Sequence, residues 1–360
     1  MNPESGLRTL DSGFILHPSS FILHPSSFIL HHFSLVKPLS HLIVTSLLTL
    51  VLAAGCAAGF RGAPPVVKLG LLAPFEELYR SDGYAVLPAV QLAISQRNAA
   101  GGVAGRQVAL VALNDNGRPE EAQRQAANLA VDQDVLAVIG PLHAAAAAAA
   151  GPVLADAGLP WIALASLTPE QQPGGFALEA APADLARRGA ELLAADGVAQ
   201  PLVLSGQAGP SAPIAADPAA AGVIWLGDAA GGAALASQLS PGILLVGGPE
   251  LGSTVFQGRA GDAAAGVRWL SAGPDASALP ADFVAAYQAL AGAPPSPQAV
   301  LAYDATNLLL DAIALAGQAG APVSRATVLQ AAARLGDAGW QGLSGSVSWQ
   351  RDTPLVLHRW

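Results

Sequence analysis

The sequence predicts an α/β protein with two lobes, each built on a doubly wound parallel sheet. Short apolar runs alternate with segments of helical periodicity, which is typical of βαβ units with right-handed crossovers. The alternation forms one series that ends near residue 165 and a second that begins near residue 183. A chain of 360 residues is long enough for two lobes that each bury a core.

The first series begins at an apolar run that follows two prolines. We expect strands at Val66–Ala73, Val108–Leu113, Val135–Ile139 and Pro160–Ala165, and helices at Tyr84–Asn98, Pro119–Asp132 and Leu142–Ala157. Gly101 and Gly102 end the first helix, because glycine readily adopts the left-handed backbone of a helix C-cap. The third helix is dominated by seven consecutive alanines.

The second series repeats the alternation. We expect strands at Pro201–Leu204, Gly222–Leu226, Ile243–Val246 and Gly266–Leu270, with helices at Ala183–Ala195 and Ala230–Leu239. Three further helices are expected at Pro280–Ala291, Pro297–Ala316 and Arg325–Arg334, and two closing strands at Ser344–Trp349 and Leu355–Arg359. Ligands of doubly wound sheets bind beyond the carboxyl ends of the strands, so the loops after each strand are the candidate site.

The amino-terminal region is predicted to be a secretory signal. Leu42–Ala54 is apolar and uncharged, Lys37 precedes it and Gly55 follows it. The run is too short to span a bilayer, which takes about 20 residues. The segment from Leu52 to Cys56 resembles the lipobox of bacterial lipoproteins, although Ala53 stands where Leu is commoner. The resemblance implies lipidation of Cys56; an ordinary cleaved signal and an uncleaved anchor are the alternatives.

A repeat of seven residues precedes this signal. FILHPSS occurs at 14–20 and again at 21–27, with a partial copy at 28–31. Proline in each complete copy rules out a continuous coiled-coil helix. We therefore expect residues 1–35 to be a non-native or disordered leader, 36–55 the lipoprotein signal peptide and 56–65 a small-residue tether.

Composition and motifs argue against several function classes. A net charge of −9 with no Lys/Arg run disfavours nucleic acid as a partner. The single cysteine cannot form an internal disulfide, and only His143 and His358 follow the signal, so no metal site is expected. No nucleophile elbow or phosphate-binding glycine loop occurs in a suitable context. We expect no cofactor and no enzymatic activity.

Several short motifs, in their order and spacing, carry a family resemblance. They are Ala73-Pro74, Gln91-Leu92-Ala93, Asn98 with Gly101-Gly102, Asn114-Asp115, Val138-Ile139-Gly140-Pro141, Gly248-Pro249-Glu250 and Leu301-Ala302-Tyr303-Asp304-Ala305. The chain from residue 66 onward resembles the leucine/isoleucine/valine-binding proteins, the type 1 periplasmic binding family that serves ABC importers. No single motif is diagnostic.

The resemblance implies two lobes that are joined by three crossings and close on a small ligand. Lobe 1 would comprise residues 66–181 and 274–342, and lobe 2 residues 182–273 and 343–360. Residues 205–221 are rich in Pro, Gly and Ala where the family has regular structure, so the second lobe is expected to be abbreviated.

The resemblance also implies ligand-binding positions. The family binds the ligand carboxylate where the third strand enters its helix, here His143 and Ala144, but alanines replace the family's hydroxyls. Ser166 and Thr168 lie in the next carboxylate- and amine-binding segment, although Ser166 could instead cap a helix. Glu250 falls on the ammonium-binding carboxylate, with an exposed loop residue as the alternative. Asp228 lies where the family has an aromatic wall.

The first loop departs from the family's small residues. Tyr79 could stack on a ligand, and Arg80 could bind a carboxylate with two hydrogen bonds. Glu76 belongs to the same candidate set; alternatively, Glu76 and Arg80 simply pair across one helical turn.

These observations predict a lipid-anchored, extracytoplasmic protein that delivers a small polar solute, amino-acid-like or an amide, to an ABC permease. A ligand-free or regulatory envelope lipoprotein that acts through protein contacts is the main alternative. A sensor ectodomain is a third hypothesis.

Overall fold

The computed structural model describes residues 64–206, 221–318, 322–349 and 353–360. The predicted leader, the signal peptide, the lipidation site Cys56 and most of the tether lie outside these ranges. Most of the segment 205–221, on which the abbreviated second lobe is predicted, also lies outside them.

The first sheet has five parallel strands in the order β2-β1-β3-β4-β5. They are β1 (Val66–Ala73), β2 (Gln107–Asn114), β3 (Val135–Ile139), β4 (Trp161–Ala163) and β5 (Gly175–Ala177). Strand β3 is buried throughout and β1 over most of its length. This is the pattern of parallel strands that are covered by helices on both faces.

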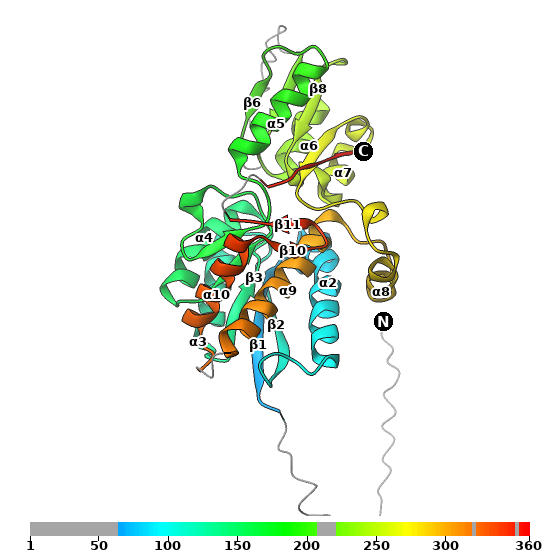
Figure 1. Ribbon diagram of the computed structural model, residues 1–360. Helices are drawn as coiled ribbons and strands as arrows, with labels where there is room; N and C mark the ends of the chain where they lie inside the picture. Colours follow the sequence, from blue (N-terminus) through cyan, green and yellow to red (C-terminus); the bar gives the residue numbers. More distant parts are fainter. Residues whose placement is uncertain (1–63, 207–220, 319–321, 350–352) are drawn as a thin grey trace, which may run out of the picture. The chain divides into compact units, whose positions relative to one another are not determined.

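Helices pack on both faces of this sheet. Their bounds are α2 (Arg80–Ala99), α3 (Pro119–Val131), α4 (Ala144–Asp156), α9 (Pro297–Gly317) and α10 (Arg325–Ala338). One apolar core joins the sheet to α2, α9 and α10, and a second joins it to α3 and α4. Figure 1 shows α2 and α9 side by side. Helix α9 is long and apolar enough to cross a membrane, but 72% of its apolar window is buried inside the fold, so it is a core helix.

The second sheet has the order β12-β9-β8-β7-β6. Its strands are β6 (Leu202–Leu204), β7 (Gly222–Trp225), β8 (Leu244–Gly247), β9 (Arg268–Ser271) and β12 (Val356–Arg359). Helix α5 (Pro182–Ala195) packs on one face, and α6 (Ala229–Gln238) and α7 (Thr254–Ala260) on the other. Two doubly wound sheets confirm the predicted fold class.

The chain passes between the two sheets three times. It crosses after β5, returns after β9 towards α8 (Ala281–Ala291), and crosses again after the hairpin of β10 (Trp340–Gly342) and β11 (Gly345–Val347). Glu179, in the first crossing, accepts hydrogen bonds from the Ser271 hydroxyl (2.7 Å) and the Ala272 N–H (2.9 Å) of the second. The buried carboxyl group thus ties two crossings together.

The structure corrects several details of the prediction, and strands β5 and β10 were not expected. Strand β12 pairs antiparallel with β9, whereas the other pairs in the second sheet are parallel. Helix α7 was not expected, because its seven residues are too short for a clear period. Helix α2 begins at Arg80 rather than Tyr84. Gly83 hid this start in the sequence, because glycine is a poor helix former. The structure needs glycine at this position, since a side chain there would meet the backbone carbonyl of Pro74.

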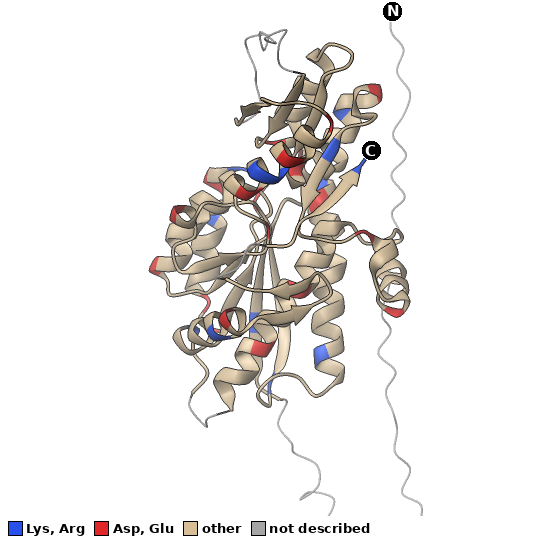
Figure 2. Ribbon diagram, turned by 45° about the horizontal axis from the view of Figure 1, so that its top comes forward, with Lys and Arg blue, Asp and Glu red and all other residues tan. Residues whose placement is uncertain are grey.

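Charged side chains are sparse and mixed in sign. Figure 2 shows acidic and basic residues interspersed along the described elements. On α5, for example, Arg187 pairs with Asp184 and Glu191, and Arg188 pairs with Glu191.

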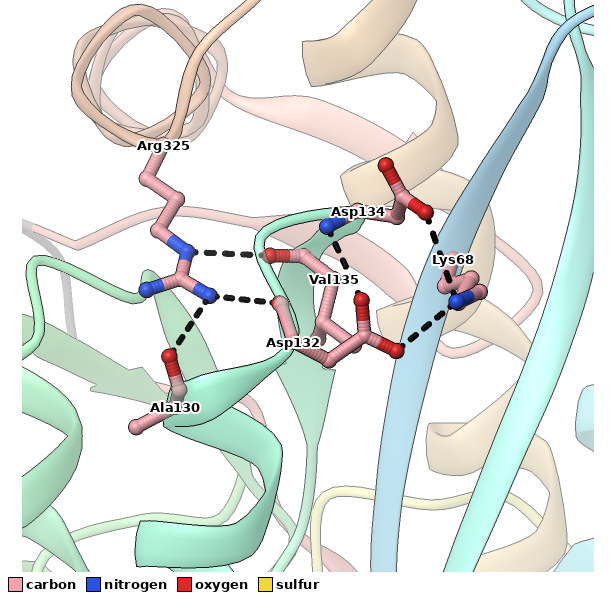
Figure 3. A network of polar contacts seen from close by, with 6 residues as sticks. All are labelled: Lys68, Ala130, Asp132, Asp134, Val135 and Arg325. Atoms are coloured by element: carbon pink, nitrogen blue, oxygen red, sulfur yellow. Dashed lines mark hydrogen bonds and ion pairs between the residues drawn. The ribbon is translucent and has the colours of Figure 1, made fainter.

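At the end of the first sheet where β1 and β3 begin, Arg325 holds several segments together. Its guanidinium donates to the carbonyls of Val135 (3.0 Å), Ala157 (3.2 Å), Ala130 (3.1 Å) and Asp132 (2.7 Å). Figure 3 shows the first residue of α10 reaching three of these groups, with the Lys68 ammonium beside two aspartates close by. A single side chain therefore satisfies carbonyls at the carboxyl ends of both α3 and α4.

Candidate functional site

Two adjoining cavities lie among the loops that follow the strands of both sheets. The outer cavity has a volume of about 530 Å³, and its lining includes Tyr79, Gly117, His143, Asp228 and Glu250. The inner pocket has a volume of about 80 Å³, and its lining includes Asp82, His143, Glu179, Glu250, Trp269 and Gln298. Because His143 and Glu250 line both spaces, the two cavities share a wall.

Local sequence places the key groups at this edge. Helix α4 starts four residues after β3 ends, with His143 as its N-cap in extended backbone. Gly140 makes this sharp turn possible: its φ is 88°, and a side chain there would meet the Leu72 carbonyl. On the other sheet, Glu250 follows β8 in the 3-10 turn Pro249–Gly252. A helix N-terminus therefore lines the same cavity as a carboxyl group from the other sheet.

Tyr79, His143 and Asp82 form a small cluster where the two cavities meet. The rings of Tyr79 and His143 lie 4.3 Å apart between centroids, and His143 Nε2 lies 3.5 Å from Asp82 Oδ2. Burial lowers the pKa of His143 to about 4 and raises the pKa of Asp82 to about 7. Since the imidazole is then neutral at pH 7, the two side chains are not an ion pair in the ligand-free protein.

Burial disfavours the ionised form of all three carboxyl groups in the inner pocket, Asp82, Glu179 and Glu250. Burial raises the pKa of Glu250 to about 8, with smaller contributions from Glu179, Asp228 and Asp82, although water still reaches part of the Glu250 side chain. Burial also raises the pKa of Glu179 to about 7, against the hydrogen bonds from Ser271 and Ala272. Among the residues of the described chain that line the inner pocket there is no Lys or Arg. The pocket is thus acidic without a compensating cation.

Six of the nine predicted ligand-binding residues line the outer cavity. They are Tyr79, His143, Ala144, Ser166, Asp228 and Glu250. Two of these have partners within the protein: the Ser166 hydroxyl donates to the Ala180 carbonyl (2.5 Å), and the Asp228 carboxylate accepts from the Gly231 N–H (2.6 Å) as the N-cap of α6.

The other three predicted residues lie outside both cavities. Glu76 is exposed, and Arg80 lines a separate surface depression with Thr254 and Arg259. Within the described ranges no ion pair joins Glu76 to Arg80; Glu77 lies instead 3.5 Å from Arg118. Thr168 caps the 3-10 turn Pro169–Gln171, with Gln171 completing the capping box.

Among the inner-pocket residues that the sequence reasoning missed are Asp82, Glu179, Trp269 and Gln298. Two signals were available. Asp82 follows Arg80 in the first turn of a helix that borders the site, and Glu179 interrupts an apolar run between two lobes. In the described residues, no group of three or more His, Cys, Asp or Glu could hold a metal ion.

Comparison with known proteins agrees with this geometry. The sequence profile described as periplasmic binding protein matches residues 66–238. Over these residues, just under half of the chain, the sequence has the pattern of that family. The match agrees with the family resemblance that the sequence motifs carry. No curated protein matches the chain significantly.

Solved structures that are similar to this chain share its fold. The branched-chain amino acid substrate-binding protein LivJ of Streptococcus pneumoniae, in complex with isoleucine, is 20% identical with a TM-score of 0.68; 82% of this chain and 96% of that chain are covered. The leucine-binding protein LivK of Thermotoga maritima is 19% identical with a TM-score of 0.69, and the match covers 82% of this chain and 95% of that chain. A solute-binding protein from R. palustris, in complex with benzoate, is 19% identical with a TM-score of 0.62, and the match covers 83% of this chain and 93% of that chain.

Proposed function

We propose that this protein captures a small polar solute, amino-acid-like or an amide, and delivers it to an ABC importer. The observation that carries the proposal is the outer cavity, where the start of α4 and Glu250 line one space. The N–H groups of a first helical turn favour a carboxylate or carbonyl oxygen, and Glu250 suits an ammonium or amide donor. The similar proteins were solved with isoleucine and benzoate, both of which carry a carboxylate.

Closure would occur about the three crossings. We assign residues 66–181 and 274–342 to lobe 1 and residues 182–273 and 343–360 to lobe 2. The bonds from Ser271 and Ala272 to Glu179 support a hinge in which the first two crossings move together.

A thermal-shift screen tests ligand capture. The solutes are amino acids, their amides and small carboxylates, because a ligand that binds only the native state raises Tm by mass action. Glu250→Gln should lower affinity for the solute that binds best, whereas Glu170→Gln, on the exposed turn after Ser166, is the matched control. Equal affinity of the two variants would remove Glu250 from the proposed site.

We further propose that Cys56 carries a diacylglycerol that anchors the mature protein to the membrane. The support is the apolar run Leu42–Ala54 followed by Gly55-Cys56. Cys56→Ser should release the protein from membranes or leave it unprocessed, and mass spectrometry of the membrane-bound protein should find the lipid. A mature protein without it would refute the anchor.

A regulatory lipoprotein of the same fold is the second candidate function. It is favoured by the alanines at the start of α4 and by the commitment of the Ser166 hydroxyl to Ala180, which leave fewer donors for a solute. If no solute in the screen raises Tm, this candidate replaces transport.

A further inference from the structure

We propose that the solute of this protein carries a cationic group, an alkyl ammonium or a guanidinium, which enters the inner pocket. The inference rests on the proposed solute-binding function and specifies the chemistry of the ligand. It starts from the three carboxyl groups of the pocket, Asp82, Glu179 and Glu250, which come from three separate parts of the chain.

The electrostatics of the ligand-free pocket favour such a group. Burial raises the pKa of Asp82 and Glu179 to about 7 and that of Glu250 to about 8, so protons neutralise the pocket in part at neutral pH. His143 faces the same space and is neutral, since burial lowers its pKa to about 4, while Asp228 adds a further acidic group from α6. A bound cation would favour the ionised carboxylates and replace those protons.

Two unused polar atoms point independently to a ligand. Trp269 is 7% exposed, lines the inner pocket, and its Nε1 has no hydrogen-bond partner within the described chain. The buried Nε2 of His143 also has none. Buried polar atoms are normally paired. The indole N–H is a donor only and cannot bond to a cationic group, so it suits an acceptor atom elsewhere on the solute or a bound water molecule. His143 Nε2 can accept a hydrogen bond from the cation when the imidazole proton is on Nδ1.

The size and chemistry of the pocket favour an organic cation over two other occupants. Among the described residues these carboxyl groups do not form a group that could hold a metal ion. An apolar side chain would offer no polar partner to the carboxyl groups of Asp82 and Glu250, which is unfavourable, whereas Glu179 keeps its bonds from Ser271 and Ala272. A volume of about 80 Å³ takes an end group of a few non-hydrogen atoms.

Matched pairs of ligands test the inference by calorimetry on the full chain in detergent. L-arginine and L-citrulline differ in a guanidinium against a neutral urea, and L-lysine and L-norleucine differ in a terminal ammonium against a methyl group. We expect the cationic member of at least one pair to bind about tenfold more tightly or better. Agmatine, which is arginine without its carboxylate, distinguishes a solute that needs only the cation from one that also uses the start of α4.

Asp82→Asn should reduce the preference for the cation about tenfold, because the two side chains have the same shape and differ in charge. Asp262→Asn, on an exposed 3-10 turn outside both cavities, is the control and should change neither affinity. A second measurement needs no variant: at pH 7.5 arginine binding should release protons and citrulline binding should not, seen as different heats in Tris and phosphate buffers.

The outcomes separate the two levels of the proposal. Equal affinity within both pairs, or an unchanged preference in Asp82→Asn with no proton release, overturns the cationic ligand but not solute binding. If none of the ligands, charged or neutral, binds or raises Tm, the proposed solute-binding function fails and the inference fails with it.

Discussion

Replacing Arg325 should test how far one guanidinium stabilises the first lobe. In Arg325→Ala four carbonyls lose a charged donor at once, those of Ala130, Asp132, Val135 and Ala157. A hydrogen bond to a charged group contributes about 1.5–3 kcal/mol when buried. Arg325 is only half-buried, so water can rehydrate the carbonyls and the sum must be discounted. We expect a loss of about 2–4 kcal/mol, which lowers Tm by roughly 4–10 °C.

The assay is thermal unfolding followed by circular dichroism, with two comparison variants. Arg325→Lys keeps the charge but has one nitrogen instead of three, so it should fall between wild type and alanine. Arg187→Ala removes an exposed arginine that pairs with Asp184 and Glu191 along its own helix, and it should leave Tm nearly unchanged. The reasoning is wrong if Arg325→Ala lowers Tm no more than Arg187→Ala does.

Three further predictions concern pH, ligand and chain start. Burial raises the pKa of Glu179 to about 7, so the folded protein retains a proton that the unfolded chain has released. The free energy of unfolding should therefore fall from about pH 6.5 to about pH 8.5. In urea titrations Glu179→Gln should reduce that fall by about 1 kcal/mol. Leucine, isoleucine and valine should bind roughly 10–1000-fold more weakly than they would with the missing hydroxyl contacts, and submicromolar leucine binding in calorimetry would contradict this. Peptides spanning 14–27 should be absent from mass spectra of native extracts; their detection would mean that the repeat is translated and retained.

Strand and helix patterns in the sequence predicted the fold class well, because buried parallel strands such as β3 appear as uninterrupted apolar runs. The antiparallel direction of β12 could not be predicted in this way. Periodicity shows which residues are buried but not which neighbour a strand pairs with, and β12 follows a crossing rather than a helix. Helix α7 was missed for a related reason, since seven residues complete only two turns.

Some residues of the candidate site could likewise be predicted from the sequence and others could not. Residues directly after a strand, such as His143 and Glu250, were found because topology brings strand ends together. Arg80 was chosen for its chemistry, but it lies on the first turn of α2 and lines the surface depression instead. Trp269 lies within β9 and Glu179 in a crossing, so their approach to the site depends on how the lobes pack, which sequence spacing does not encode.

The position of α9 along the chain has a consequence for the order of folding. This helix fills the core between the first sheet and its neighbours, yet it follows the whole of the second sheet except β12. The amino-terminal third of the molecule therefore cannot complete its core until residues near 317 have been synthesised and have emerged from the ribosome. Contacts of such long sequence separation close slowly. A nascent chain of this design therefore remains open for most of its synthesis, and its first lobe completes its core only when the second is nearly finished.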